Sequence, residues 1–155
     1  MKKLLMFIVC VAFVLGVSAQ KTKEEIPTAA KAGFAAKFPA AQKAKWSIEK
    51  PGEFEVDFIL NKVEQSALVD TKGNIIETEV EVKESELPQA VKATIAKDFA
   101  GYKLDEITKA TDAKGVVAFE MEAVKGKDKL AIEFDVNGQL LSKSPLMEEK
   151  EGKEK

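Results

Sequence analysis

The chain has 155 residues, with 26 acidic and 24 basic side chains, and its formal net charge at pH 7 is −2. It contains no histidine, which excludes the commonest general base and the Ser-His and Cys-His nucleophile arrangements. A mildly acidic chain without a basic cluster is also a poor match for nucleic acid, so we expect no nucleic-acid partner.

Residues 1–19 have the pattern of a secretory signal peptide. Two lysines precede an apolar run, and the small residues Val17-Ser18-Ala19 follow it. The run is shorter than the roughly 20 apolar residues that a membrane span needs. We therefore expect cleavage after Ala19, a periplasmic or secreted location, and no membrane attachment after cleavage. The single cysteine, Cys10, leaves with this segment, so thiol chemistry and internal disulfides are excluded.

Two segments after the signal peptide have apolar residues four positions apart, which predicts two amphipathic helices. The apolar positions are Ile26, Ala30, Phe34 and Phe38 in the first segment and Leu87, Val91, Ile95 and Phe99 in the second. Pro27 and Pro88 suit the first helical turn, where a missing N–H costs nothing. Pro39 ends the first helix.

Alternation of apolar and polar residues predicts about four strands after each helix. The expected strands lie at 46–48, 54–60, 63–69, 76–82, 104–110, 116–124, 130–136 and 139–142. Phe54-Glu55 and Asp70-x-x-Gly73 return, at one common displacement, as Phe119-Glu120 and Asp135-x-x-Gly138. We interpret this as an internal repeat, with repeat one at about 25–82 and repeat two at about 86–144.

The expected fold class is α+β, a tandem repeat of one helix plus about four antiparallel strands, with the helices packed on one face of the sheet. The domain would span residues 20–145. Residues 146–155 are charged and have nothing apolar to bury, which is typical of a disordered tail.

Large aromatic side chains and the Asp-x-x-Gly segments have structural interpretations. We assign Trp46 to the core and not to a binding anchor, because it lies on an alternating strand that a helix can cover. The phenylalanines assigned to the core are Phe34, Phe38, Phe54, Phe58, Phe99, Phe119 and Phe134. The Asp-x-x-Gly segments are too short for a calcium loop of the EF-hand type, and Asp followed by Gly suits a tight turn.

Several of these features together resemble the PepSY-like family, which is similar to the β-lactamase inhibitory protein. They are the signal peptide, the Ile26-Pro27 to Phe38-Pro39 helix, Trp46, the 53–58 strand and the paired Asp-x-x-Gly turns. The resemblance implies a small exported protein with helices on one face of a sheet and the other face open. Relatives include an enzyme inhibitor and prosegments of metallopeptidases, so it implies binding or inhibition without catalytic residues.

The open face is the candidate binding surface, because alternation places acidic residues there with apolar residues among them. The predicted partner-binding residues are Glu55, Asp57, Ile59, Leu68, Ile75, Glu79, Glu120, Glu122 and Glu133. Glu77, Glu81 and Val124 share the face. Two interpretations remain at this point, a solvated surface and a protein-binding patch.

The leading hypothesis is an exported, non-catalytic binding module, inhibitor-like by resemblance, that docks a protein partner through its open sheet face. One alternative is a structural or interaction component of the cell envelope without a discrete ligand, associating along its sheet edges. Another is a hydrolase that uses paired carboxylates. We expect no catalytic residues, no metal ligands and no cofactor.

Overall fold

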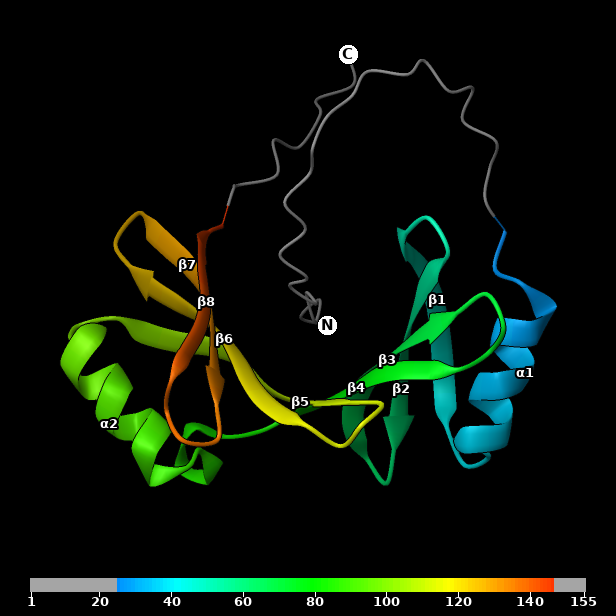
Figure 1. Cartoon of the computed structure of the whole chain (residues 1–155), viewed down its shortest axis with the longest axis horizontal. Coiled ribbons are helices and arrows are strands. Elements are labelled where there is room, and N and C mark those ends of the chain that lie inside the picture. The colour runs from blue at the N-terminus through cyan, green and yellow to red at the C-terminus, as the bar shows by residue number, and fades with distance from the viewer. Residues whose placement is uncertain (1–24, 147–155) are drawn as a thin grey trace, which may run out of the picture.

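Eight strands and two α-helices make up residues 25–146, the part of the chain that the computed structural model describes (Figure 1). The helices are α1 (Thr28–Lys37) and α2 (Gln89–Asp98), and a 3₁₀ turn covers Glu84–Glu86. The strands are β1 (Gln42–Lys50), β2 (Glu53–Leu60), β3 (Val63–Asp70), β4 (Ile75–Glu81), β5 (Lys103–Asp112), β6 (Val117–Lys125), β7 (Asp128–Asp135) and β8 (Leu140–Pro145). The expected signal peptide and charged tail lie outside the described residues.

The expected fold class is wrong in how the strands are joined. All eight strands form one antiparallel sheet in the order β1 to β8. The central junction is the pairing of β4 with β5, which runs from Glu77 opposite Asp112 to Glu81 opposite Thr108. The architecture is therefore one continuous eight-stranded sheet with two helices, and not a tandem repeat of helix-plus-four-strand units. Alternation reports which side chains share a face, but it does not report which strand edges pair.

The two helices begin and end where the prolines and the apolar spacing place them. Pro27 and Pro88 are the residues immediately before α1 and α2, and both have extended backbone. The N–H groups of Phe38 and Phe99 donate to the carbonyls of Phe34 and Ile95 and close the last turns. No helix in the described part of the chain has the length and apolarity needed to cross a membrane.

The hydrophobic core consists of two clusters, one under each helix. The α1 cluster contains Ala30, Phe34, Phe54, Val56, Phe58, Ala67 and Val69. The α2 cluster contains Leu87, Val91, Phe99, Ile107, Phe119, Met121, Ala123, Ile132 and Phe134. Trp46 and Phe38 are partly buried against the α1 cluster, and the Trp46 ring meets Phe34 edge to face, with centroids 5.5 Å apart. The assignment of Trp46 and the phenylalanines to the core is confirmed.

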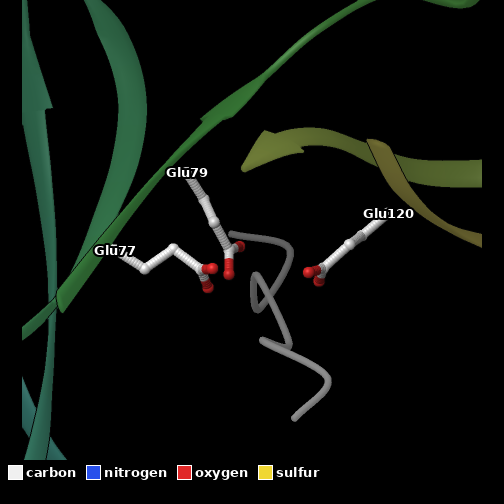
Figure 2. A group of neighbouring side chains, drawn as sticks. All are labelled: Glu77, Glu79 and Glu120. Atoms are coloured by element: carbon white, nitrogen blue, oxygen red, sulfur yellow. The ribbon is translucent and has the colours of Figure 1, made fainter. Parts of the chain in front are cut away.

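Both helices cover the same face of the sheet, and the sheet bends away from them. The strand register places Phe54 beside Val69 on the helix-covered face, and it places Phe119 beside Phe134 on that face. In Figure 1, α1 and α2 lie at opposite ends, on the outer side of the bend. The other face is therefore concave, and glutamates from β4 and β6 converge on it (Figure 2).

Asp-x-x-Gly turns join neighbouring strands, and the aspartate carboxylate closes each turn. Asp70 Oδ1 accepts hydrogen bonds from the N–H groups of Lys72 and Asn74, both at 2.8 Å. Asp135 Oδ1 accepts two in the same pattern. Hydrogen bonding lowers the pKa of both carboxyls. The turn interpretation is confirmed, and Asp112-x-x-Gly115 is a further turn of this kind that the sequence analysis missed.

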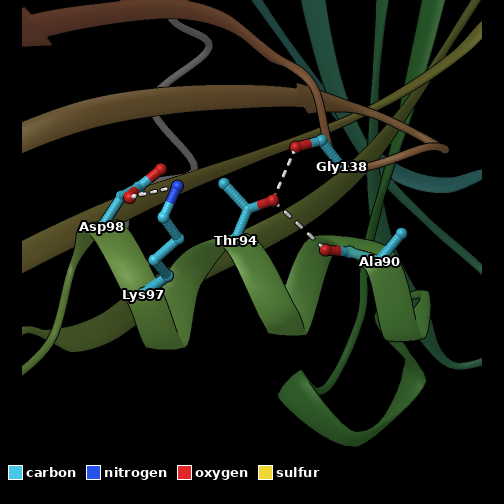
Figure 3. A network of polar contacts seen from close by, with 5 residues as sticks. All are labelled: Ala90, Thr94, Lys97, Asp98 and Gly138. Atoms are coloured by element: carbon cyan, nitrogen blue, oxygen red, sulfur yellow. Dashed lines mark hydrogen bonds and ion pairs between the residues drawn. The ribbon is translucent and has the colours of Figure 1, made fainter.

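The turn between β7 and β8 lies directly against α2, which fixes how the helix sits on the sheet. Figure 3 shows Thr94 Oγ1 between two carbonyl oxygens, 2.8 Å from that of Gly138 and 3.3 Å from that of Ala90. A Cβ atom at Gly138 would lie only 2.5 Å from the Ala90 oxygen. Gly73 approaches α1 in the same way, because its Cβ would lie 2.4 Å from the Ala29 oxygen. Glycine is therefore required where each turn meets a helix.

Gly138→Ala should lower the unfolding free energy by at least about 1 kcal/mol more than Gly115→Ala, because it also forces overpacking against α2. The two glycines have similar positive φ angles, 78° and 83°, so they share the backbone penalty. Only Gly138 meets neighbouring backbone, since nothing lies within 4 Å of a Cβ at Gly115. Urea unfolding of both variants measures the difference. Equal losses would show that α2 does not depend on this contact.

Candidate functional site

The concave face of the sheet gathers carboxylates from four strands. We call it the acidic face, and its carboxylates are Glu55, Asp57, Glu77, Glu79, Glu120, Glu122 and Glu133. Cross-strand pairing defines it, because Asp57 faces Ser66 and Ser66 in turn faces Glu79. Glu120 faces Glu133 in the other half of the sheet. No helix of the described residues packs on this face, since both core clusters lie on the opposite one.

The register puts most of the sequence-predicted binding residues on this face. The residues placed there are Glu55, Asp57, Ile59, Leu68, Glu79, Glu120, Glu122 and Glu133. Ile75 is not among them, because it packs against the α1 cluster on the opposite face. A register shift between Leu68 and Val69 adds one residue to β4, and this turns Ile75 toward the helix.

Three carboxylates of the acidic face converge at its centre, and we call them the glutamate cluster. Glu77 and Glu79 extend from β4 and Glu120 extends from β6 (Figure 2). One oxygen from each lies within 4.8 Å of the others. The intervening strand β5 places Ala110 opposite Glu79 and Thr108 opposite Glu120. These short side chains leave room for the glutamates to meet across β5.

Glu79 is the most confined member of this cluster. It is 1% exposed, and neither of its carboxyl oxygens has a hydrogen-bond partner among the described residues. Ser66, its cross-strand neighbour, is fully buried, and its hydroxyl also has no partner there. Burying a charge without a partner costs several kcal/mol, so such groups change protonation or bind something.

Burial and mutual repulsion raise the pKa values of the central glutamates. Burial, and then the charge of Glu120, raises the pKa of Glu79 to about 9. Burial, and then the charge of Glu77, raises the pKa of Glu120 to about 8. Farther from the centre, burial and then the charge of Asp57 raise the pKa of Glu55 to about 7. The hydrogen bond that Ser47 donates to Glu55 lowers this pKa, but by less than burial raises it. Burial and mutual repulsion therefore favour the protonated carboxyls at the centre of the acidic face, and a bound cation would favour the ionised ones.

The chemistry available to this arrangement is cation binding. Carboxylates can accept lysine or arginine side chains from a partner, or they can coordinate a hard metal ion. The alternation of Glu77, Glu79 and Glu81 in the sequence predicts that Glu77 lies on this face, but Glu77 was not among the predicted partner-binding residues. Ser66 was missed, and nothing in its sequence context distinguishes it from a solvated serine.

Comparison with known structures identifies the fold. No family model and no curated protein matches the chain, so the PepSY-like resemblance is not confirmed at the level of sequence. A protein of Bacteroides eggerthii that is assigned to the periplasm superposes with a TM-score of 0.71, covering 79% of this chain and 90% of that one at 17% identity. A DUF2874 family protein from Bacteroides uniformis gives 0.70, with 77% and 88% covered at 19% identity.

A BLIP-like protein from Bacteroides fragilis superposes with a TM-score of 0.67, covering 84% of this chain and 94% of that one at 19% identity. The chain therefore has the fold of the BLIP-like and DUF2874 structures. The TM-scores establish the shared fold, and at identities of 17–19% the function has to be argued from the acidic face.

The unfolding free energy should fall as the pH rises from about 5 to 9 in buffer that contains a chelator. In the folded chain the pKa of Glu79 is about 9, against an ordinary value of 4.5, so folding favours the protonated carboxyl. The contribution of this group to the unfolding free energy is therefore complete below pH 4.5 and is lost as the pH rises toward 9. The slope can reach about 1.4 kcal/mol per pH unit for one group. Urea unfolding at pH 5, 7 and 9 measures it.

Glu79→Gln should flatten this pH dependence and raise stability at pH 8, because the amide carries no charge to bury. Glu81→Gln is the matched control, since Glu81 lies on the same strand and is exposed. Glu81→Gln should keep the slope of the unmodified protein, and the pKa assignment is wrong if Glu79→Gln keeps it as well.

Proposed function

We propose that this protein is an exported, non-catalytic binding module that docks a protein partner through its acidic face. The observation that supports this most directly is the lack of internal charge compensation at the centre of the face. Lys45 and Lys129 lie close enough to Asp57 and Glu122 to offset part of the rise in their pKa values. Among the described residues, no lysine offsets the raised pKa of Glu79.

The acidic face suits a partner that presents lysine or arginine side chains. Their positive charges would stabilise the ionised carboxylates that the chain itself leaves uncompensated. Half-buried rim residues such as Asp57 and Glu122 would guide the approach, since rim charges act mainly on association rates. Ile59 offers an apolar contact at one end of the face, where it is half-buried. Leu68 is 2% exposed and contributes to the floor of the face.

The comparisons support binding and export in general terms. The chain shares its fold with a BLIP-like protein and with a protein assigned to the periplasm. The 1–19 segment, with its signal-peptide pattern, agrees with export. Lack of histidine removes the commonest catalytic base from the carboxylate-rich face. In its more specific form, the proposal is that the partner is an enzyme and that docking inhibits it.

Association along a sheet edge is the second candidate, and one observation favours it. Strand β8 lies at one edge of the sheet, where Leu140 and Leu141 are exposed. However, β8 also contains Lys143 and ends at Pro145, and its pairing with β7 contains a bulge. Lysine, proline and bulges are the features with which edge strands avoid further pairing. We therefore favour the acidic face.

Glu122→Lys should slow association with the partner by severalfold and weaken its salt dependence, because it reverses a charge at the rim of the acidic face. The partner is first captured from a periplasmic extract, identified by mass spectrometry and purified. Association rates are then measured by surface plasmon resonance at 50 and 200 mM salt. Asp98→Lys is the control, since it makes the same charge change on α2 at an exposed position.

Equal association rates for Glu122→Lys and the unmodified protein, at both salt concentrations, would contradict docking through the acidic face. Slowing by Asp98→Lys alone would move the interface to the helix-covered side.

A further inference from the structure

We propose that the glutamate cluster is a calcium site, in which Glu77, Glu79 and Glu120 supply carboxylate oxygens and Ser66 supplies its hydroxyl. The sequence alone predicts no metal ligands. The calcium site does not rest on the proposed function, because the ion would bind the chain in the absence of any partner.

The spacing of the carboxylates suits one ion. Calcium binds oxygen ligands at about 2.3–2.6 Å, so two ligands of the same ion lie at most about 5 Å apart. One oxygen from each of the three glutamates lies within 4.8 Å of the other two. In Figure 2, Glu77 and Glu79 extend from the same side of β4 and bring their carboxyl groups together, and Glu120 points toward them from β6. Three oxygens can therefore reach a common centre without a change in strand pairing.

The hydroxyl of Ser66 is an independent indication that something binds here. Ser66 is fully buried, lies directly opposite Glu79 on β3, and has no hydrogen-bond partner among the described residues. Both carboxyl oxygens of Glu79 are also buried without a hydrogen-bond partner among these residues. Buried polar groups in folded proteins nearly always have a partner. A cation on the acidic face would provide one partner for the carboxylates and the hydroxyl together.

The donor set favours calcium over other biological metals. All four ligands are oxygen atoms, which select hard cations, and the chain has no histidine to attract zinc or copper. Magnesium requires nearly ideal octahedral geometry at 2.0–2.1 Å and gives up its water reluctantly. Calcium accepts irregular sets of six to eight oxygens, so water can complete the coordination on the open side of the face.

Calcium should raise the melting temperature of the purified protein in a saturable way, because a ligand that binds only the folded chain stabilises it. The protein is freed of metal with a chelator and dialysed, and CaCl₂ is then added from 0 to 10 mM at constant ionic strength and pH 8. We expect a dissociation constant of about 10⁻⁴–10⁻³ M, as in extracellular calcium modules. Isothermal titration calorimetry should show one ion per chain.

Glu79→Gln should weaken calcium binding at least tenfold, and Ser66→Ala should weaken it severalfold while preserving the fold. Glu81→Gln is the matched control and should bind as the unmodified protein does, because Glu81 is exposed and lies outside the glutamate cluster. The site is refuted if the unmodified protein shows no saturable shift, or if MgCl₂ at equal ionic strength gives the same shift. Undiminished binding by Glu79→Gln would also refute it. None of these results depends on a protein partner, so the docking proposal is tested separately.

Discussion

Hydrogen bonding between β4 and β5 joins the two halves of the sheet, and the acidic face exists because of this junction. The bend at the centre of the sheet leaves the two helices on the outer side and makes the other face concave (Figure 1). Across the junction, the short side chains of Ala110 and Thr108 let glutamates of β4 and β6 approach each other. Two separate sheets would place these carboxylates far apart in solvent.

The structure therefore combines a conventional core with an electrostatically costly surface. The core clusters under α1 and α2 bury aromatic and aliphatic side chains, which is the main source of folding free energy. Glu79 and Ser66 are buried on the opposite face without hydrogen-bond partners in residues 25–146, and such groups reduce stability. Natural proteins keep costly groups of this kind mainly at functional sites. Both proposals follow from this contrast, since each supplies positive charge to the same carboxylates.

Local features of the fold could be predicted from the sequence because they depend on short-range geometry. Apolar residues four positions apart and flanking prolines located α1 and α2, and alternation located the core phenylalanines. The turn at Asp70 followed from the needs of a tight turn. In contrast, the pairing of β4 with β5 joins residues about thirty positions apart, and alternation carries no information about it. The bulge that turns Ile75 toward α1 could not be predicted either, because alternation does not report which residues pair across two strands.

The acidic face could be predicted only in outline. Alternation placed Glu79 and Glu120 on a common face, but their convergence depends on the curvature of the sheet and on the small residues of β5. The sequence could not indicate that Ser66 is buried, because serine is ordinary on an exposed strand.

Glu79 is buried without a compensating charge from the part of the chain that the structure describes, and its own titration tests this most directly. The protein is labelled with ¹³C at glutamate side chains, freed of metal, and titrated by nuclear magnetic resonance, with Glu79→Gln used to assign the signal. The Glu79 carboxyl is expected to titrate with a pKa raised to about 9. A pKa near 4.5, the ordinary value for glutamate, would show that Glu79 is solvated and would contradict its burial without a compensating charge.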